Sequence, residues 1–328
     1  MGRYLVTGSA GFIGWRVAHQ LLERGDRVVG VDNLNDAYDV RLKDWRLHTL
    51  KGHPNFTFEQ LDIVNRPALE AVFERVGRPS FNAVINLAAR AGVRQSVENP
   101  WIYLETNATG TLNLLDACVR YGIPKFVLAS TSSLYGTHNP RPYTETANTD
   151  LMLSPYAASK KAAEVMAYTF YYLHKVDVSI LRYFTVYGPA GRPDMSVFRF
   201  VQWIREGKPV IVFGDGNQER DFTYVDDVAR GTIAALKPLG YEIINLGCDT
   251  PVVLNEAIRI TERCTGQKAT IETRLRHPAD VDATWANINK AKALLDWEPQ
   301  TDFAEGVRRL VAWYDENRSW AREIRVGS

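Results

Sequence analysis

Hydrophobic and polar positions alternate in a regular order along the first half of the chain. A short apolar run at 3–6 precedes a stretch in which Ile13, Val17 and Leu21 recur at helical spacing. Further short apolar runs, each next to a stretch of helical spacing, occupy residues 27–31, 56–61, 83–87, 125–129 and 178–183. Strands that alternate with helices form βαβ units. The pattern therefore predicts an α/β fold with a doubly wound parallel sheet.

Two prolines mark the expected starts of long helices. Asn99 precedes Pro100, and Ser154 precedes Pro155. A polar cap followed by proline in the first turn favours helix initiation, so we expect long helices near residues 100–120 and 155–174. Apolar side chains lie on more than one face of the second, which indicates burial on both sides. They include Val165, Met166, Tyr168 and Phe170.

The pattern changes after Tyr187. Glycines and prolines crowd at 188–193, and the later segments are shorter and less regular. Apolar residues at helical spacing from 303 to 314 predict a closing helix. We expect two parts with a ligand cleft between them. They are a larger domain of residues 1–187, rejoined by about 221–246, and a smaller α/β C-terminal lobe of residues 188–220 and 247–328.

The composition is that of an ordinary globular chain. Its 328 residues contain 39 Lys and Arg against 38 Asp and Glu, a formal net charge of +1. Without a basic field, neither nucleic acid nor a membrane surface is an expected partner. Cys118, Cys248 and Cys264 are widely spaced, and no His lies at ligand spacing from acids, so we expect neither disulfides nor a metal site. A reducing, cytoplasmic location is the default.

A glycine-rich segment follows the first predicted strand and opens the first predicted helix. Gly8 permits a tight turn, Gly11 lets the backbone approach a pyrophosphate, and Gly14 allows close helix packing. The helix N-terminus adds oriented N–H groups for the anion. Asp32 ends the second strand, where its carboxylate can accept hydrogen bonds from ribose hydroxyls and repel a 2′-phosphate. The segment therefore predicts a Rossmann-type domain that binds NAD.

A tyrosine and a lysine form a second candidate motif. Tyr156 and Lys160 are four residues apart on one predicted helix, so their side chains share a face. An ammonium near a phenol favours the phenolate, which suits a catalytic base. An exposed pair without function has the same spacing. The hydroxyl run from Ser130 to Ser133 follows a strand at the ligand-binding edge of the sheet, although such residues are also common in turns.

Several segments give the chain a resemblance to a known family. They read TGSAGFIG at 7–14, ASTSSLYG at 129–136, YAASK at 156–160 and RYFTVYGP at 182–189. Together they resemble the extended short-chain dehydrogenase/reductases that act on nucleotide sugars, over nearly the whole chain. VDNLNDAYDV at 31–40 and GPAGRPDM at 188–195 are similar to the UDP-glucuronate 4-epimerase branch.

The resemblance implies an isomerase that holds NAD tightly and converts UDP-glucuronate to UDP-galacturonate through a transient 4-keto sugar. It implies Tyr156 as the base, Lys160 as its electrostatic partner and Thr131 as the helper hydroxyl. The expected cofactor-binding residues are Gly8, Gly11, Phe12, Ile13, Gly14, Asp32, Asn33, Asn35, Asp62, Ile63, Leu87, Ala88, Ala89, Asn107, Tyr156, Lys160 and Tyr183. The expected substrate-binding residues are Thr131, Ser132, Ser133, Tyr156, Thr185, Arg192, Arg220 and Asp280.

A uronic acid makes a further demand, because a 4-ketone with a C6 carboxylate can lose CO₂ unless that carboxylate is held. Arg192 offers a planar fork for it. Thr185, Ser132 and Ser133 offer hydroxyl donors. An alternative for Arg192 is an ordinary surface ion pair. The resemblance to the family also implies that Arg220 binds the UDP portion.

Other functions stay open. A decarboxylase that makes UDP-xylose shares the 4-keto intermediate, and 4-epimerases of neutral UDP-sugars are close relatives, many of which carry Asn where this chain has Thr185. His277 replaces an Arg or Gln that usually faces the nucleotide, which puts the UDP contacts in doubt. A non-catalytic NAD-binding protein is disfavoured by the intact Tyr156, Lys160 and Thr131. The family commonly forms homodimers through the two long helices.

Overall fold

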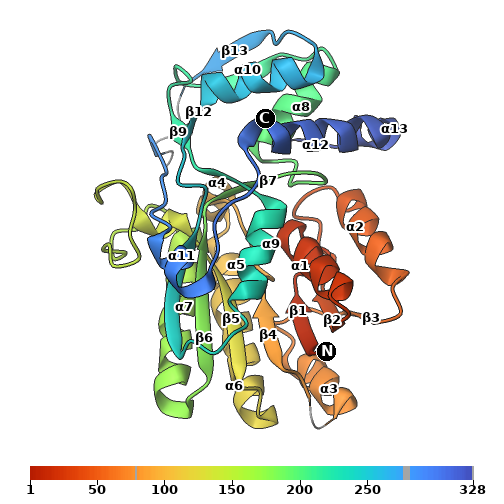
Figure 1. The fold of residues 1–328 in the computed structure, drawn as a ribbon, viewed down its shortest axis with the longest axis vertical. Helices are drawn as coiled ribbons and strands as arrows, with labels where there is room; N and C mark the ends of the chain where they lie inside the picture. Colours follow the sequence, from red (N-terminus) through yellow and green to blue (C-terminus); the bar gives the residue numbers. More distant parts are fainter. Residues whose placement is uncertain (78–79, 276–280, 327–328) are drawn as a thin grey trace.

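The computed structural model describes residues 1–77, 80–275 and 281–326, and its centre is a seven-stranded parallel sheet (Figure 1). The strands are β1 (Arg3–Thr7), β2 (Arg27–Asp32), β3 (Phe56–Gln60), β4 (Ala83–Asn86), β5 (Lys125–Thr131), β6 (Asp177–Tyr183) and β11 (Tyr241–Leu246). Their order is β11-β6-β5-β4-β1-β2-β3, so the winding direction reverses between β1 and β4. The predicted doubly wound sheet is confirmed, and ligands bind such sheets at the carboxyl ends beside this reversal.

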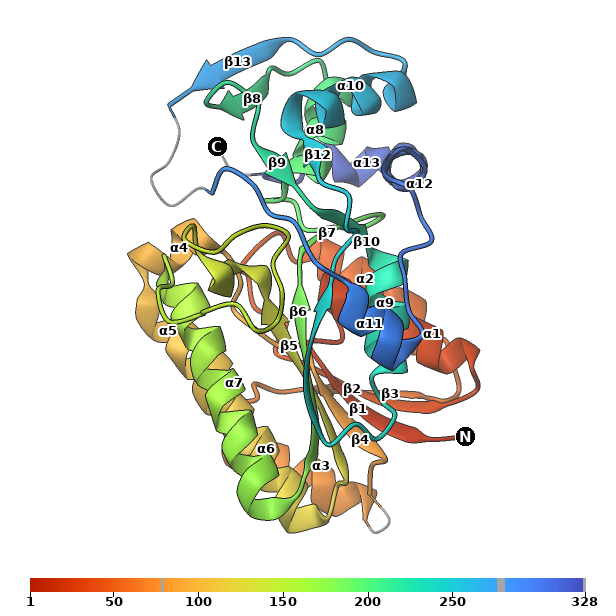
Figure 2. The same ribbon diagram turned by 60° about the vertical axis from the view of Figure 1, so that its left-hand side comes forward.

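Helices cover both faces of the sheet, as Figure 2 shows. One layer contains α1 (Phe12–Glu23), α2 (Arg41–Lys51), α9 (Val225–Ala234) and α11 (Asn289–Leu295). The other contains α3 (Arg66–Val76), α6 (Gly110–Tyr121) and α7 (Pro155–His174). Successive strand residues point to opposite faces, so Leu5 joins the core under α3, α6 and α7, whereas Val6 joins the core under α1 and α9.

The helix predicted from Pro100 is interrupted. It consists of α5 (Pro100–Leu104), a π-helical turn (Glu105–Thr109) and α6, and the Asn99 side chain makes no capping hydrogen bond. The π turn buries Asn107. The predicted cap of α7 is confirmed, because Ser154 Oγ accepts a hydrogen bond from Ala157 N at 3.2 Å.

The rest of the chain packs beyond the carboxyl ends of the strands. Its helices are α8 (Ser196–Arg205), α10 (Leu254–Thr265), α12 (Phe303–Glu316) and α13 (Arg318–Ala321), with α4 (Val93–Glu98) at the border. Short strands pair as β7 (Thr185–Tyr187) with β10 (Phe222–Tyr224), β8 (Val210–Phe213) with β13 (Ile271–Arg274), and β9 (Glu219–Arg220) with β12 (Val252–Val253). The closing helix predicted from Phe303 is confirmed as α12.

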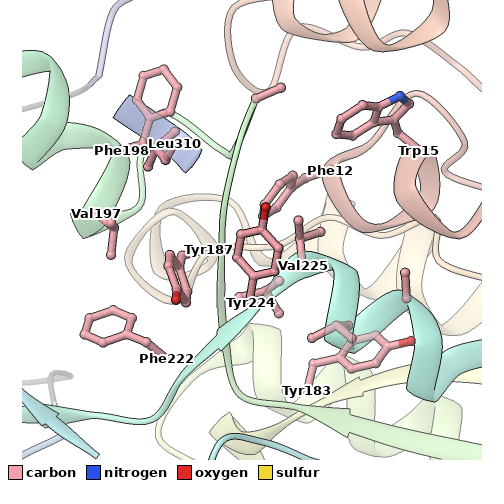
Figure 3. Packing of buried hydrophobic residues seen from close by; sticks show 14 of the residues in the cluster. Phe12, Trp15, Tyr183, Tyr187, Val197, Phe198, Phe222, Tyr224, Val225 and Leu310 are labelled. Carbon is pink, nitrogen blue, oxygen red and sulfur yellow. The ribbon is translucent and has the colours of Figure 1, made fainter. Parts of the chain in front are cut away.

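One apolar core joins the sheet to this smaller part. Figure 3 shows Phe12 and Trp15 of α1 in the same cluster as Tyr187, Phe198 and Leu310. The two parts therefore meet through packed side chains. None of the helices in the described ranges is both long and apolar enough to cross a membrane.

Candidate active site

A cavity of about 660 Å³ lies at the carboxyl ends of the central strands, where the smaller part covers the sheet. The described residues that the sequence predicted for cofactor or substrate all line this cavity, except Asn107. Asp280 and His277 lie outside the described residues. The structure thus brings residues that lie far apart in the sequence, from Gly8 to Leu254, into one site.

The glycine turn between β1 and α1 forms one wall of the cavity. Gly8 has φ +69°, a conformation that glycine adopts without steric cost. A Cβ on Gly14 would overlap the carbonyl oxygen of Gly8, and one on Gly11 would lie 2.8 Å from the same oxygen. The turn is therefore a side-chain-free surface at a helix N-terminus, which fits a pyrophosphate.

Asp32 lies at the end of β2 and is more enclosed than the sequence indicates. Its carboxylate accepts hydrogen bonds from Leu34 N at 2.8 Å and Ala10 N at 3.2 Å. Lys43 of α2, which is buried and lines the cavity, places its Nζ 3.5 Å from Asp32 Oδ1. The predicted repulsion of a 2′-phosphate is therefore partly offset by an ammonium that the sequence analysis missed.

Polar side chains beyond Asp32 form a connected rim. Asn33 Nδ2 donates to Asp62 Oδ2 at 2.7 Å, and Asn35 Nδ2 donates to Asn33 Oδ1 at 2.6 Å. The other Asp62 oxygen accepts from Val64 N at 3.0 Å. These contacts fix the ends of β2 and β3 beside the glycine turn. The side-chain-free glycine turn fits the pyrophosphate of NAD, the Asp32 carboxylate fits a ribose, and this polar rim fits the adenosine end.

Tyr156 and Lys160 lie one turn apart on α7 and both line the cavity. Burial raises the pKa of Tyr156 above its ordinary value of 10, while a hydrogen bond with Thr131 and the positive charge of Arg192 lower it. Burial lowers the pKa of Lys160 to about 8, and the Glu164 charge acts in the opposite direction. Lys160 Nζ donates to the Ala129 carbonyl at 2.8 Å. Thr131 and Arg192 thus favour the phenolate in this structure, and the electrostatic role of Lys160 stays a prediction.

Asn107 lies behind the cavity wall and supports the turn that carries Tyr156. Its Nδ2 donates to Ser159 Oγ at 2.9 Å, and Ser159 Oγ donates to the Tyr156 carbonyl at 2.8 Å. The same amide group holds Arg90, accepting from its N at 2.9 Å and donating to its O at 3.0 Å. Asn107 is therefore a positioning residue in this structure, placed by the π turn.

The hydroxyl run predicted after β5 also faces the cavity. Thr131, Ser132 and Ser133 line it, and Thr131 Oγ1 accepts from Ser133 N at 3.1 Å. Ser130 also lines the cavity, but its Oγ donates to Glu164 Oε1 at 2.6 Å. The hydroxyl of Ser130 therefore links β5 to α7.

Arg192 reaches the cavity from the loop before α8. It forms a two-pronged ion pair with Asp194, Nε to Oδ1 at 3.1 Å and Nη2 to Oδ2 at 2.5 Å, and both residues line the cavity. Although burial raises the pKa of Asp194, the Arg192 guanidinium lowers it below the ordinary value of 3.8. Arg192 thus does form the ion pair of the alternative interpretation, with both side chains about one quarter exposed, but the pair lines the cavity, and the carboxylate role stays a prediction. Thr185 of β7 lines the same wall.

Three further arginines line the cavity. Arg220 of β9 was predicted there, and Arg94 and Arg199 are additions that the sequence analysis missed. The Arg94 guanidinium lies 4.4 Å from the centre of the Phe213 ring. Arg199 Nε donates to the Val326 carbonyl at 2.8 Å. Cationic and aromatic groups together suit a nucleoside diphosphate.

The site and its surroundings offer no metal centre among the described residues, where no group of three His, Cys, Asp or Glu could hold an ion. Cys118, Cys248 and Cys264 are free thiols. Burial raises the pKa of Cys248 to about 12.

Comparison with known proteins extends this picture. The profile of the GDP-mannose 4,6 dehydratase family matches residues 5–310. A UDP-glucuronate 4-epimerase of Thermodesulfobacterium geofontis (strain OPF15) is 58% identical over 327 residues, covering 99% of this chain and 100% of that protein. A UDP-glucuronic acid 4-epimerase from Bacillus cereus, solved with UDP-glucuronic acid and NAD, superposes with a TM-score of 0.89 at 34% identity, covering 96% and 99% of the two chains. A UDP-glucose 4-epimerase from Thermotoga maritima, solved with UDP-glucose, gives 0.88 at 31% identity with the same coverage.

Proposed function

Because this chain belongs to the extended short-chain dehydrogenase/reductase family of nucleotide-sugar enzymes, we propose that it is an NAD-dependent isomerase that interconverts UDP-glucuronate and UDP-galacturonate. The observation that carries the proposal is the meeting of Tyr156, Thr131 and Arg192 in one cavity. Tyr156 would serve as the base, Thr131 as the helper hydroxyl and Arg192 as the partner of the carboxylate. Together these groups suit the inversion of C4 in a uronic acid.

Tyr156 acts as the base for the C4 hydroxyl. Thr131 shares a hydrogen bond with the phenol and so stabilises the phenolate. NAD⁺, when bound, supplies the reversible oxidation of the sugar at C4. Lys160, fixed by the Ala129 carbonyl, keeps a positive charge near the cofactor-binding wall. With the cofactor bound, C4 would lose a hydride to it as Tyr156 takes the hydroxyl proton. After the 4-keto sugar has rotated in the cavity, C4 would regain the hydride on its other face as Tyr156 returns the proton to the C4 oxygen, so that C4 is inverted with no net oxidation.

Arg192 and the hydroxyls of Ser132, Ser133 and Thr185 hold the C6 carboxylate. Holding it prevents the C5–C6 bond from standing perpendicular to the carbonyl, the geometry from which a β-keto acid loses CO₂. Asp194 already occupies one edge of the Arg192 fork, and Nη2 also donates to the Ala91 carbonyl at 3.4 Å, which leaves Nη1 on the remaining edge. We therefore propose that the substrate carboxylate binds the remaining edge and the hydroxyls, so that no charged group of the protein loses its partner.

We propose that the UDP portion binds toward the cavity-lining arginines Arg94, Arg199 and Arg220. This assignment rests on their shared lining position and on the diphosphate charge. We propose that residues 1–187 with about 221–246 form the NAD-binding part and that 188–220 with 247–328 form the UDP-sugar-binding lobe, while Arg94 and the carboxylate-binding hydroxyls come from the NAD-binding part. We place the protein in the cytoplasm, where its three free thiols stay reduced.

A second copy of this chain is the expected partner. Helices α5 and α7 pack against each other, and both leave large apolar side chains exposed. On α5 these are Trp101, 78% exposed, and Leu104; on α7 they are Val165, Tyr168, Tyr172 and Leu173. An apolar surface of this kind on the short helix α5 and the long helix α7 supports a homodimer formed across them.

The direct test is incubation with UDP-glucuronate without added cofactor, followed by NMR of the product. UDP-galacturonate is the expected product, with no net consumption of NAD. UDP-xylose would instead identify a decarboxylase, and unchanged substrate would refute the proposal. Turnover of UDP-glucose faster than UDP-glucuronate would favour a 4-epimerase of neutral sugars, the runner-up raised by the Thermotoga maritima similarity.

Replacement of Arg192 tests the carboxylate clamp. Arg192→Ala is expected to weaken apparent affinity for UDP-glucuronate by about 100-fold, since truncating one side of a desolvated charge pair typically costs about 3 kcal/mol. Affinity for UDP-glucose, which lacks the carboxylate, should change by less than about threefold. Calorimetric titration of both ligands measures the two effects. Equal losses on the two ligands would remove Arg192 from the clamp.

A further inference from the structure

Arg46 of α2 is a buried guanidinium beside the cavity that the proposed function does not use. Its side chain is 0% exposed. Among the residues that the structure describes, all of its hydrogen-bond acceptors are neutral oxygens. Nε and Nη2 both donate to the Ala190 carbonyl, at 3.0 and 2.6 Å. Nη2 also donates to Gly191 O at 3.3 Å, and Nη1 donates to Ala10 O at 3.1 Å and Tyr38 OH at 2.7 Å.

These contacts use the whole donor capacity of the side chain. A guanidinium has five N–H groups, and the five hydrogen bonds of Arg46 match them. The rings of Phe12 and Tyr38 lie 5.8 and 5.5 Å from its central carbon. Burying a charge without a carboxylate is costly unless its donors are satisfied. The guanidinium is therefore held in one place by its acceptors, and it fixes them in return.

Four of the five hydrogen bonds go to two segments of the site, and the fifth goes to Tyr38. Ala10 lies in the glycine turn between Gly8 and Gly14, and its N–H binds Asp32. Ala190 and Gly191 come directly before Arg192. Arg46 therefore connects the glycine turn, which fits the cofactor, to the loop that carries Arg192, the proposed partner of the substrate carboxylate.

The loop needs such a support because its backbone is unusual. Ala190 has φ +52°, a left-handed conformation that is unfavourable for a residue with a Cβ. Its carbonyl takes two of the Arg46 hydrogen bonds, which hold that conformation. On the other side of the loop, a Cβ on Gly191 would lie 3.6 Å from the Phe12 ring, so the loop runs close to α1.

We propose that Arg46 is a positioning residue that sets the Arg192 loop against the glycine turn and thereby determines how well the site binds a carboxylate-bearing sugar. This inference rests on the proposed function. Arg46 does not contact the sugar; it acts through the placement of Arg192. A change in the glycine turn on one side is thus transmitted through a single guanidinium to the substrate ligand on the other.

The test compares ligands with and without the carboxylate on the NAD-loaded protein. Arg46→Met removes the charge at similar length, and Arg46→Lys keeps the charge but lacks the fork that spans two segments. Both are expected to weaken binding of UDP-glucuronate by about tenfold, the equivalent of one lost hydrogen bond to a charged group, and binding of UDP by less than about twofold. Arg41→Met on the same helix is the matched control, because Arg41 pairs with Asp39 and Glu323 away from the cavity.

A double-mutant cycle separates this role from a general effect on folding. In an Arg192→Ala background, Arg46→Lys should cause no further loss of UDP-glucuronate affinity, because its effect passes through Arg192. Additive losses, or equal losses for UDP and UDP-glucuronate at unchanged NAD content, would overturn the inference. If Arg46→Met fails to fold, the lysine variant carries the test. A wild-type protein that neither binds nor converts UDP-glucuronate would refute the proposed function instead.

Discussion

Tyr156→Phe is expected to lower the rate of UDP-glucuronate turnover by about 10²- to 10⁴-fold, the range that a positioned acid–base group contributes. The substitution removes only the phenolic oxygen. The ring contacts Tyr103 edge-to-face, with centroids 6.2 Å apart at 74°, and phenylalanine retains this packing. The cavity should therefore keep its shape, and NAD should remain bound.

The measurement is product formation by NMR under single-turnover conditions, with bound NAD determined by extraction and absorbance. Tyr168→Phe is the control, because it makes the same change on the same helix at a half-exposed position. That variant should retain nearly the full rate. A Tyr156→Phe protein that keeps more than about a tenth of the wild-type rate would show that another group removes the C4 proton.

The fold was predictable because apolar periodicity reports burial directly. The strands at 27–31 and 125–129 are apolar runs in the sequence and buried strands in the structure. The π turn at 105–109 was not predictable. Its residues fit an ordinary helix, and the extra residue in the turn is stabilised by contacts of Asn107 with Arg90 and Ser159, which are distant in sequence.

The site was predictable where its residues lie in one short motif and not where they meet only through the fold. Lys43 and Arg46 show the limit, because charged residues in a helix ordinarily mark its solvent face. Here they share the buried stripe with Leu42, Leu47 and Leu50. A charged residue at an apolar position of an amphipathic helix indicates a buried charge and so a candidate functional residue, and this indication was present in the sequence. Its partners could not, because the acceptors of Arg46 at 190–191 lie some 144 residues away.

The ion pair of Arg192 and the other arginines that line the cavity also could not be predicted from local sequence. Asp194 is two residues from Arg192, and only the loop conformation turns its carboxylate onto the guanidinium. Arg94 and Arg199 come from helices on different parts of the fold. Their approach to one cavity depends on how the smaller part packs over the sheet, which local sequence does not encode.

Glu164→Gln is expected to destabilise the protein by about 3 to 5 kcal/mol, the cost of breaking a buried ion pair from one side. Glu164 lies one turn after Lys160 on α7 and is 2% exposed. Its Oε1 accepts from Arg182 Nε at 3.0 Å, and its Oε2 accepts from Arg182 Nη2 at 2.8 Å. Glutamine would leave the Arg182 charge buried without a counter-charge. Urea unfolding at a fixed NAD concentration measures the change, since bound ligand adds to apparent stability.

The same substitution should alter the pH dependence of turnover. Burial lowers the pKa of Lys160 to about 8, and the negative charge of Glu164 raises it, so removing that charge moves the pKa below 8. On the alkaline side of the pH profile, the rate should therefore begin to fall at a lower pH than in the wild-type protein, because Lys160 loses its proton earlier. Glu70→Gln, in an exposed pair with Arg66 and Arg120, is the control and should cost less than about 1 kcal/mol with no change in the pH profile.

A double variant, Glu164→Gln with Arg182→Met, distinguishes the unpaired charge from the loss of hydrogen bonds. Removing both charges should recover part of the stability, because no buried cation is left without a partner. It should not restore the pH profile, because Lys160 still lacks the nearby negative charge. If stability and pH profile recovered together, Glu164 would act on the site only through folding. Recovery of stability alone would assign it a separate electrostatic role in keeping Lys160 protonated.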